Sequence, residues 1–140
     1  MVGCGRVGSN VAIRLQSEGW EVTVVDEKEE ALSRLGDAWT GGFVVGHGMD
    51  AKVLSEADME GADAVVVATN GDNTNLVIAQ VATRRFEVPM VVARILDPAR
   101  ADFYRAQGMN IVCPTQTAID DLTGAVKKFT DAAQALEARR

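Results

Sequence analysis

The chain contains only two cysteines, Cys4 and Cys113, among its 140 residues. Two cysteines are too few for a disulfide framework, so we expect both to be reduced thiols of a cytoplasmic protein. Basic residues are also in the minority, since 14 Lys and Arg stand against 20 Asp and Glu, which gives a net charge of −6. A nucleic-acid-binding domain needs a basic patch or stripe, so nucleic acid is not expected as a partner.

Long hydrophobic runs are absent as well. No apolar run approaches the roughly 20 residues that a membrane-spanning helix requires, so direct membrane insertion is not expected. No charged segment followed by an apolar stretch opens the chain, so export is not indicated. Low-complexity linkers and internal repeats are missing too. Apolar residues make up 47% of the chain, which fits one globular domain with a packed core.

The most informative segment present is residues 3–8, which read Gly-Cys-Gly-Arg-Val-Gly. This is the G-x-G-x-x-G pattern of a dinucleotide-binding loop, and Asp26 follows Gly8 by 18 residues, close to the spacing expected for a ribose-binding carboxylate. In such a loop the glycines allow a tight turn, close approach of a pyrophosphate to the backbone, and close packing of helix on sheet. The N-terminus of the next helix then faces the phosphates.

Apolar, β-branched runs alternate with helix-period stretches along the rest of the chain. The runs lie at residues 21–26, 43–46, 62–68, 90–95 and 110–113. Because they are continuous, they fit strands buried on both faces of a parallel sheet. The sequence therefore predicts an α/β, Rossmann-like, doubly wound six-strand parallel sheet. Its first strand is expected to be truncated, since only Met1 and Val2 precede the glycine loop.

Helices are predicted between these strands. Val7, Val11 and Leu15 recur every four residues and predict a sheet-facing stripe on the first helix. A second helix is expected to contain Ala31, Leu32 and Leu35 and to stop at Gly36. A third is expected over residues 73–86. A fourth should begin with Asp97 as cap and Pro98 at its first position, and should end before Gly108.

Polar residues follow the predicted strands, at the edge where doubly wound sheets bind ligands. Asp26 can accept hydrogen bonds from both ribose hydroxyls, and Glu27 beside it disfavours a 2′-phosphate, which favours NAD or an adenine nucleotide over NADP. The alternative for Asp26 is an acid that complements a helix dipole. His47, the only histidine, could lie beside an adenine, be merely solvated, or act as a base, although no motif ties it to a nucleophile. Asp50 is expected to cap a short helix.

Two further segments point toward phosphates and ribose. Residues 69–75 form a small polar loop that runs into a helix N-terminus, which suits ribose or phosphate contacts but is equally typical of a capping sequence. Arg94 stands inside an apolar run, where a cation requires an anionic partner, either a phosphate or a carboxylate such as Asp97. Arg6 projects from the glycine loop and could contact phosphate oxygens in bidentate fashion.

Taken together, the segments GCGRVG, VVDE, ATNGDNTNL and ARILDP resemble the nucleotide-binding RCK domain of potassium transport regulators, also called KTN or TrkA-N. The resemblance extends from Met1 to about Ile119 and implies a cytoplasmic subunit that binds NAD(H) or ATP/ADP. It further implies a homodimer or higher ring that gates a membrane potassium channel or transporter and associates with the membrane only through that partner. It implies a nucleotide-binding domain over residues 1–118, followed by a helix over residues 119–140.

By position, the resemblance places the phosphates on the glycine loop, the ribose on Asp26, and residues 69–94 further along the site. No catalytic residue and no metal ligand is predicted. The expected nucleotide-binding residues, with those that adjoin each motif, are Gly3, Gly5, Arg6, Val7, Gly8, Asp26, Glu27, His47, Asp50, Thr69, Asn70, Asp72, Asn75 and Arg94.

The C-terminal segment carries a narrow apolar stripe. Spacings of three and four residues separate Ile119, Leu122, Val126, Phe129, Ala133 and Leu136, which is the seam of two interacting helices. Gly124 interrupts the stripe and predicts a bend or a break. The stripe must cover either the protein's own core or a second copy, and the family resemblance favours the second copy.

Three functions remain open from the sequence alone: a regulatory nucleotide sensor, the NAD-binding portion of a dehydrogenase or reductase without its substrate domain, and another nucleotide-binding role. A small reductase would usually show a Tyr-x-x-x-Lys pair. Tyr104, the only tyrosine, is followed four places on by Gly108. The sequence therefore favours the sensor, and an enzyme is not expected.

Overall fold

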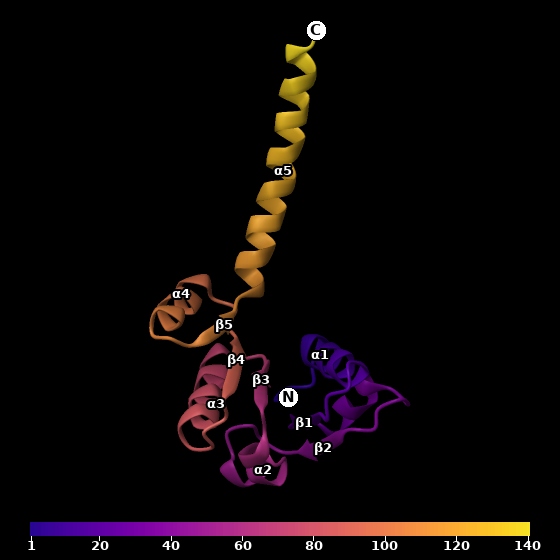
Figure 1. Ribbon diagram of the computed structural model, residues 1–140, viewed down its shortest axis with the longest axis vertical. Coiled ribbons are helices and arrows are strands. Elements are labelled where there is room, and N and C mark those ends of the chain that lie inside the picture. The colour runs from indigo at the N-terminus through magenta and orange to yellow at the C-terminus, as the bar shows by residue number, and fades with distance from the viewer.

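The computed structural model describes all 140 residues, and its centre is a parallel sheet with helices on both sides (Figure 1). Strands β1 (Thr23–Asp26) and β2 (Gly42–Val45) pair with each other, and strands β3 (Ala64–Val67), β4 (Met90–Arg94) and β5 (Asn110–Val112) pair in that order. All the pairings are parallel, as the continuous apolar runs predicted.

Val2 joins the two groups of strands. It forms parallel bridges to Val25 of β1 and to Val67 of β3. Its N–H donates to the Val66 carbonyl (2.8 Å), and its own carbonyl accepts from Ala68 N (2.9 Å). The order is therefore β2-β1-Val2-β3-β4-β5, which confirms the Rossmann-like plan with a first strand shortened to one bridging residue.

The helices are α1 (Arg6–Ser17), the 3₁₀ helix η1 (Glu29–Leu35), α2 (Ala51–Glu56), the 3₁₀ turn η2 (Met59–Gly61), α3 (Asp72–Arg84), α4 (Pro98–Ala106) and α5 (Pro114–Ala138). The α4 helix begins as predicted, because the Asp97 carboxylate accepts from Arg100 N at 3.0 Å and proline occupies the first turn. Gly108, with φ +90°, follows α4. None of the helices is both long enough and apolar enough to cross a bilayer.

The sheet-facing stripe predicted for the first helix is wrong. The buried face of α1 consists of Gly8, Ser9 and Ala12, whereas Val7 is 43% exposed. Small side chains let α1 lie close to the sheet, so the buried face is displaced by one position from the valine stripe. The segment after β1 is a 3₁₀ helix, although it does end at Gly36, which adopts φ +76°.

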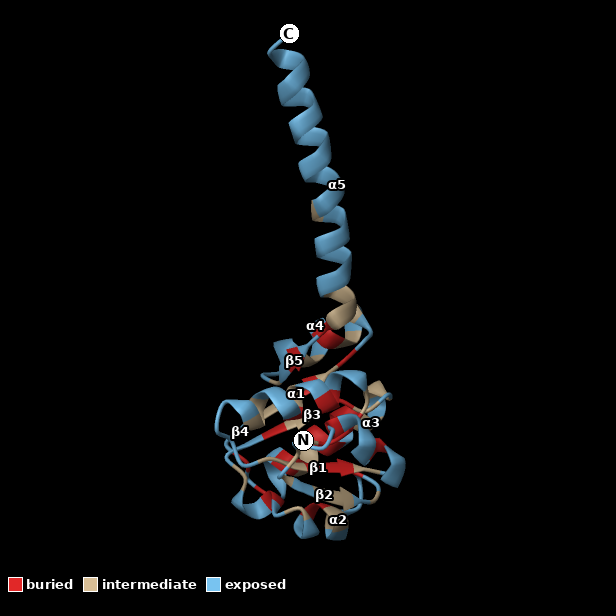
Figure 2. Cartoon of the chain, turned by 90° about the vertical axis from the view of Figure 1, so that its right-hand side faces the viewer, coloured by how far each residue is buried: buried red, intermediate tan, exposed pale blue.

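The C-terminal helix also differs from its prediction. It begins at Pro114 instead of residue 119 and continues through Gly124 to Ala138 without a break. A single glycine weakens a helix by only about 1 kcal/mol, which the 25-residue helix accommodates. The helix extends away from the sheet, and none of its residues is buried (Figures 1 and 2).

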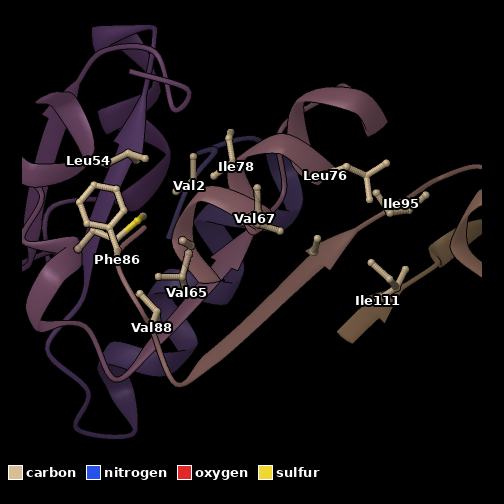
Figure 3. Close-up of a cluster of buried hydrophobic side chains, with 14 of the residues drawn as sticks. Val2, Leu54, Val65, Val67, Leu76, Ile78, Phe86, Val88, Ile95 and Ile111 are labelled. Carbon is tan, nitrogen blue, oxygen red and sulfur yellow. The ribbon is translucent and has the colours of Figure 1, made fainter. Parts of the chain in front are cut away.

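The sheet separates two hydrophobic clusters. The larger has 17 buried residues and lies on the side of α2, α3 and α4, with Ile78, Leu54 and Ile95 among its fully buried members (Figure 3). The smaller has five and lies beneath α1 and η1, around Val24 and Ala12. The carboxyl ends of the strands therefore meet along one edge, where the loops 3–8, 26–28, 46–50 and 69–72 lie.

Candidate functional site

The glycine loop leaves the sheet at Val2, between β1 and β3, and its glycines have different surroundings. Gly3 has φ +96°, and a Cβ there would lie 2.7 Å from the Ala68 carbonyl oxygen. A Cβ at Gly8 would lie 2.0 Å from the Gly3 carbonyl oxygen. Around Gly5, by contrast, no atom lies within 4 Å of a built Cβ. Gly3 and Gly8 are therefore needed for the turn, while Gly5 leaves room for a pyrophosphate to approach the protein backbone.

The first turn of α1 presents unpaired donors to that space. Gly5 is the N-cap residue, and no side chain caps the helix. The N–H groups of the first turn therefore lack intrahelical partners, which makes this end an anion-binding position. Arg6 and Val7, the first helical residues, are exposed, and the Arg6 guanidinium forms no ion pair.

Asp26, the last residue of β1, contacts the glycine loop directly. Its Oδ2 accepts from Cys4 N at 2.7 Å, and its Oδ1 accepts from Lys28 N at 2.9 Å. Each carboxylate oxygen retains a further lone pair, so the pair can still accept ribose hydroxyls. The two hydrogen bonds hold the carboxylate beside the glycine loop.

Glu27 and His47 are in contact across the ends of β1 and β2. His47 Nε2 lies 3.1 Å from Glu27 Oε1, and His47 Nδ1 accepts from Met49 N at 3.1 Å. Both side chains are about half exposed or more. Asp50 caps α2 as predicted, because its Oδ1 accepts from Lys52 N at 2.9 Å. The N–H of Gly46, the residue before His47, donates to the Asp26 carbonyl. This hydrogen bond holds the loop after β2 at the same edge of the sheet as Asp26.

Thr69, Asn75 and Arg94 form one hydrogen-bonded network at the ends of β3 and β4. The buried Asn75 Oδ1 accepts from both the N–H and the hydroxyl of Thr69. Its Nδ2 donates to the carbonyls of Thr69 (3.1 Å) and Arg94 (2.8 Å). The Arg94 Nη2 donates to the Thr69 carbonyl at 2.8 Å, while its buried Nε has no partner. An unpartnered guanidinium nitrogen at this edge suits an anionic or carbonyl-bearing ligand.

Asp72 and Asn70 do not belong to this hydrogen-bonded network. Asp72 Oδ1 accepts from Leu96 N at 2.8 Å and Oδ2 accepts from Asp97 N at 3.0 Å, so the carboxylate ties the start of α3 to the loop after β4. Each oxygen thus accepts one backbone N–H and, as in Asp26, keeps a further lone pair. Asn70 is exposed, and its side chain forms no hydrogen bond.

Removal of the Asp72 carboxylate should therefore act on stability. We expect Asp72→Ala to lose about 1–2 kcal/mol of unfolding free energy, because the N–H groups of Leu96 and Asp97 lose their acceptors. Asp72→Asn, which keeps one acceptor oxygen, should lose less. Urea denaturation measures both variants, and an unchanged midpoint for Asp72→Ala would contradict this structural role.

Cys4 and Arg34 were not predicted to act together. Arg34 Nη1 donates to the Cys4 carbonyl at 3.1 Å, and Cys4 Sγ donates to the Ala31 carbonyl at 3.4 Å. These two contacts fasten η1 to the glycine loop. Burial, together with the nearby Asp26 carboxylate, raises the pKa of the Cys4 thiol, which keeps it a neutral donor. No sequence pattern marked Arg34, since its partner is a backbone carbonyl 30 positions away.

The structure therefore places the predicted residues along one edge of the sheet. Asp26 contacts the loop at Cys4, Gly3 packs against Ala68 and Thr69, and Thr69 joins Arg94. Free N–H groups, an acceptor carboxylate and a guanidinium with one unpartnered nitrogen thus occur one after another along that edge. These donor and acceptor types fit the phosphates and ribose of a nucleotide.

The profile of the TrkA-N domain matches residues 1–115. The chain belongs to the TrkA-N domain family. It is 39% identical over 122 residues to the Trk system potassium uptake protein TrkA of Streptomyces coelicolor, which covers 87% of this chain and 55% of that protein. It is 30% identical over 119 residues to a TrkA homologue of Methanothermobacter thermautotrophicus, with 84% and 55% covered. This TrkA-N chain thus spans about half the length of these curated relatives.

Solved structures show the same fold. The GsuK RCK domain superposes with a TM-score of 0.78 at 22% identity and covers 94% of this chain and 28% of that one. The Kef CTD of Shewanella denitrificans in its AMP-bound form superposes with a TM-score of 0.77 at 21% identity, covering 96% and 85%. These likenesses confirm that the TrkA-N chain has the architecture expected from its sequence.

Proposed function

We propose that this TrkA-N chain is a nucleotide-binding regulatory subunit, or part of one, of a potassium uptake system. Its ligand is NAD(H) or an adenine nucleotide such as ATP or ADP. The observation that carries the proposal is the glycine loop. The N-terminus of α1, which follows the loop, has no side-chain cap, and Cys4 N within the loop donates to the Asp26 carboxylate. The names of the curated relatives supply the transport system, and the AMP-bound Kef structure supports the ligand class.

Each part of the nucleotide has a candidate contact. The N–H groups at the start of α1 and the Arg6 guanidinium would bind the phosphates, with Gly5 leaving room for them. Asp26 would accept the ribose hydroxyls, and the Glu27–His47 pair would border the base-proximal end. Thr69 and Arg94 would contact the portion of the ligand that extends across Gly3, while Asn75 holds both of them in place.

A sensor of this kind needs two states of different ligand affinity, not a catalytic group. The proposed subunit acts at the cytoplasmic side of a membrane potassium channel or transporter and is held there by that partner. We further propose that it functions as a homodimer or a higher ring. The support for assembly is α5, whose Leu122, Val126 and Phe129 are 70%, 66% and 77% exposed. A stripe of large apolar side chains on a projecting helix marks a contact with another protein surface.

A thermal-shift titration with ATP, ADP, NAD and NADH tests the nucleotide site. A ligand present at 100 times its Kd stabilises the folded state by about 2.7 kcal/mol, so at least one nucleotide should raise Tm by several degrees. Asp26→Ala and Arg6→Ala should each reduce that rise, because they remove a ribose acceptor and a phosphate donor.

Asp37→Ala and Arg14→Ala are matched controls that change the same charges outside the site, and their shifts should equal that of the parent chain. If none of the four nucleotides shifts Tm, or if Asp26→Ala and Arg6→Ala bind as the parent does, the assignment of the site is wrong.

A further inference from the structure

A cavity lies at the edge of the sheet opposite the proposed nucleotide site. Strands β4 and β5 begin at this edge, at Met90 and Asn110, and helices α3 and α4 end there. The cavity has a volume of about 360 Å³ and lies between the last turn of α3 and the turn that joins α4 to β5. Small-molecule sites begin at roughly 300 Å³, so this cavity suits a small ligand.

Two tight turns hold both helix ends beside the starts of the strands. After α3 the chain turns at Glu87, whose φ of +52° is uncommon for a residue other than glycine, and Val88 N then donates to the Ala82 carbonyl at 3.1 Å. After α4 the chain turns at Gly108, with φ +90°. Both helices therefore end at the wall of the cavity.

The two helix ends supply free acceptors. The carbonyls of Thr83, Arg84 and Gln107, three residues of the cavity wall, accept no hydrogen bond from the protein. Each helix C-terminus also carries roughly half a unit of negative charge and favours a cation. An ammonium group has three N–H donors and no acceptor, so it matches these carbonyls.

Arg84 supplies the opposite charge. Its side chain is the only charged one among the lining residues, and it is exposed and forms no ion pair. Arg105, in the last turn of α4, is by contrast paired with Asp102 at 3.2 Å. A free guanidinium favours a carboxylate, which it can bind through two parallel hydrogen bonds.

The lining also carries carboxamides that the protein itself does not use. Gln80 on α3 and Gln107 after α4 form no side-chain hydrogen bond, whereas Gln16 uses its amide on backbone groups. A carboxamide both donates and accepts, so Gln80 and Gln107 can bond either end of a polar ligand. Val88 and Val91 add apolar surface for a few carbon atoms.

The charges around the cavity nearly cancel, since one guanidinium stands against two helix C-termini of roughly −0.5 each. A ligand that carries one charge of each sign leaves that balance undisturbed. We propose that this cavity binds a small zwitterion, with its carboxylate on Arg84 and its ammonium group at the free carbonyls of the two helix ends. This is the chemistry of a free amino acid. No aromatic ring and no helix N-terminus lines the cavity, so it differs in kind from the proposed nucleotide site.

Three probes with related carbon chains test the assignment on the full chain. L-2-Aminobutyrate carries both charged groups, butyrate lacks the ammonium group, and propylamine lacks the carboxylate. The zwitterion should bind with a Kd on the order of 1 mM. Butyrate and propylamine should each bind at least fivefold more weakly, because each loses one of the two charged contacts. Titration followed by ¹H–¹⁵N NMR gives each Kd and should move the amide signals of Gln107 and Gly108.

Arg84→Gln should raise the Kd of L-2-aminobutyrate at least fivefold, close to that of propylamine for the parent chain. Arg14→Gln is the matched control, because Arg14 is also an exposed arginine in the last turn of a helix. It should change the Kd less than twofold. The amide spectrum of Arg84→Gln shows directly that the variant is folded.

Three results would overturn the inference. If butyrate binds as tightly as L-2-aminobutyrate, the helix ends hold no ammonium group and the cavity is a simple anion site. If Arg84→Gln binds the zwitterion as the parent chain does, the carboxylate is not on Arg84. If no amide signal around the cavity moves at about 50 times the expected Kd, the cavity holds no such ligand. None of these results bears on the proposed nucleotide site, which the nucleotide titration tests separately.

Discussion

Gly8→Ala should destabilise the protein by about 3 kcal/mol or more, the largest effect expected for any change in the glycine loop. The new Cβ would lie 2.0 Å from the Gly3 carbonyl oxygen, a backbone atom that cannot rotate away as a side chain can. Gly3 in turn is held by its N–H donating to the Val25 carbonyl at 2.8 Å. Relief of the clash would therefore move α1 away from the sheet. Urea denaturation should show the loss, together with a Tm lower by on the order of 10 °C.

Gly5→Ala is the control for that prediction, since the same atom is added to the same loop. The site has φ −78°, which alanine adopts readily, and no atom lies within 4 Å of the added Cβ. Stability should change by no more than about 0.5 kcal/mol. Nucleotide affinity should nevertheless fall tenfold or more, because the methyl group occupies the approach to the free N–H groups. Unimpaired nucleotide binding by Gly5→Ala would show that the phosphates do not approach there.

Asn75→Ala should have the second largest effect, a loss of about 3 kcal/mol or more in the free energy of unfolding. The amide is 1% exposed, and it bonds the Thr69 N–H, the Thr69 hydroxyl and the carbonyls of Thr69 and Arg94. Truncation leaves several of these buried groups without partners, and it also leaves a small cavity. Chemical denaturation followed by circular dichroism gives the magnitude.

Asn70→Ala, in the same loop, is the matched control. Its side chain is exposed and forms no hydrogen bond, so stability should remain within about 0.5 kcal/mol of the parent. If Asn75→Ala were as mild as Asn70→Ala, the network at the ends of β3 and β4 would not contribute to folding as described.

The elements that the sequence predicted well are those set by local patterns. Continuous apolar runs located all five multi-residue strands to within two residues at each end, because a run of consecutive β-branched residues is a local signal of a strand in a parallel sheet. The Asp97–Pro98 pair located the start of α4, because both residues act within their own turn. The glycine loop and Asp26 were likewise predicted, and the structure brings them into contact.

The features that the sequence did not decide are those in which distant segments meet. The Val7 stripe had the period of a buried face, yet tight packing of α1 on the sheet favours Gly8 and Ala12 there. Asp72 stands at a helix start, where a carboxylate can serve a ligand or the backbone. Only the fold shows that Leu96 and Asp97 lie opposite it. The Arg34 contact with Cys4 depends on how η1 lies against the loop, which no spacing encodes.

The single bridging residue between the two halves of the sheet has a consequence for cooperativity. Among the strands, only the backbone pairings made at Met1–Gly3 connect β1–β2 to β3–β5, although the core of 17 crosses this junction because it includes Val25 of β1. A sheet joined so narrowly can open along that line at a lower free energy than global unfolding requires. Asp26 follows β1 on one side of Val2, and Thr69 follows β3 on the other side. A ligand bound to both residues would therefore hold the two halves of the sheet together. Ligand binding would thereby make the whole sheet more rigid. The end of β5, from which α5 begins, would become more rigid with it.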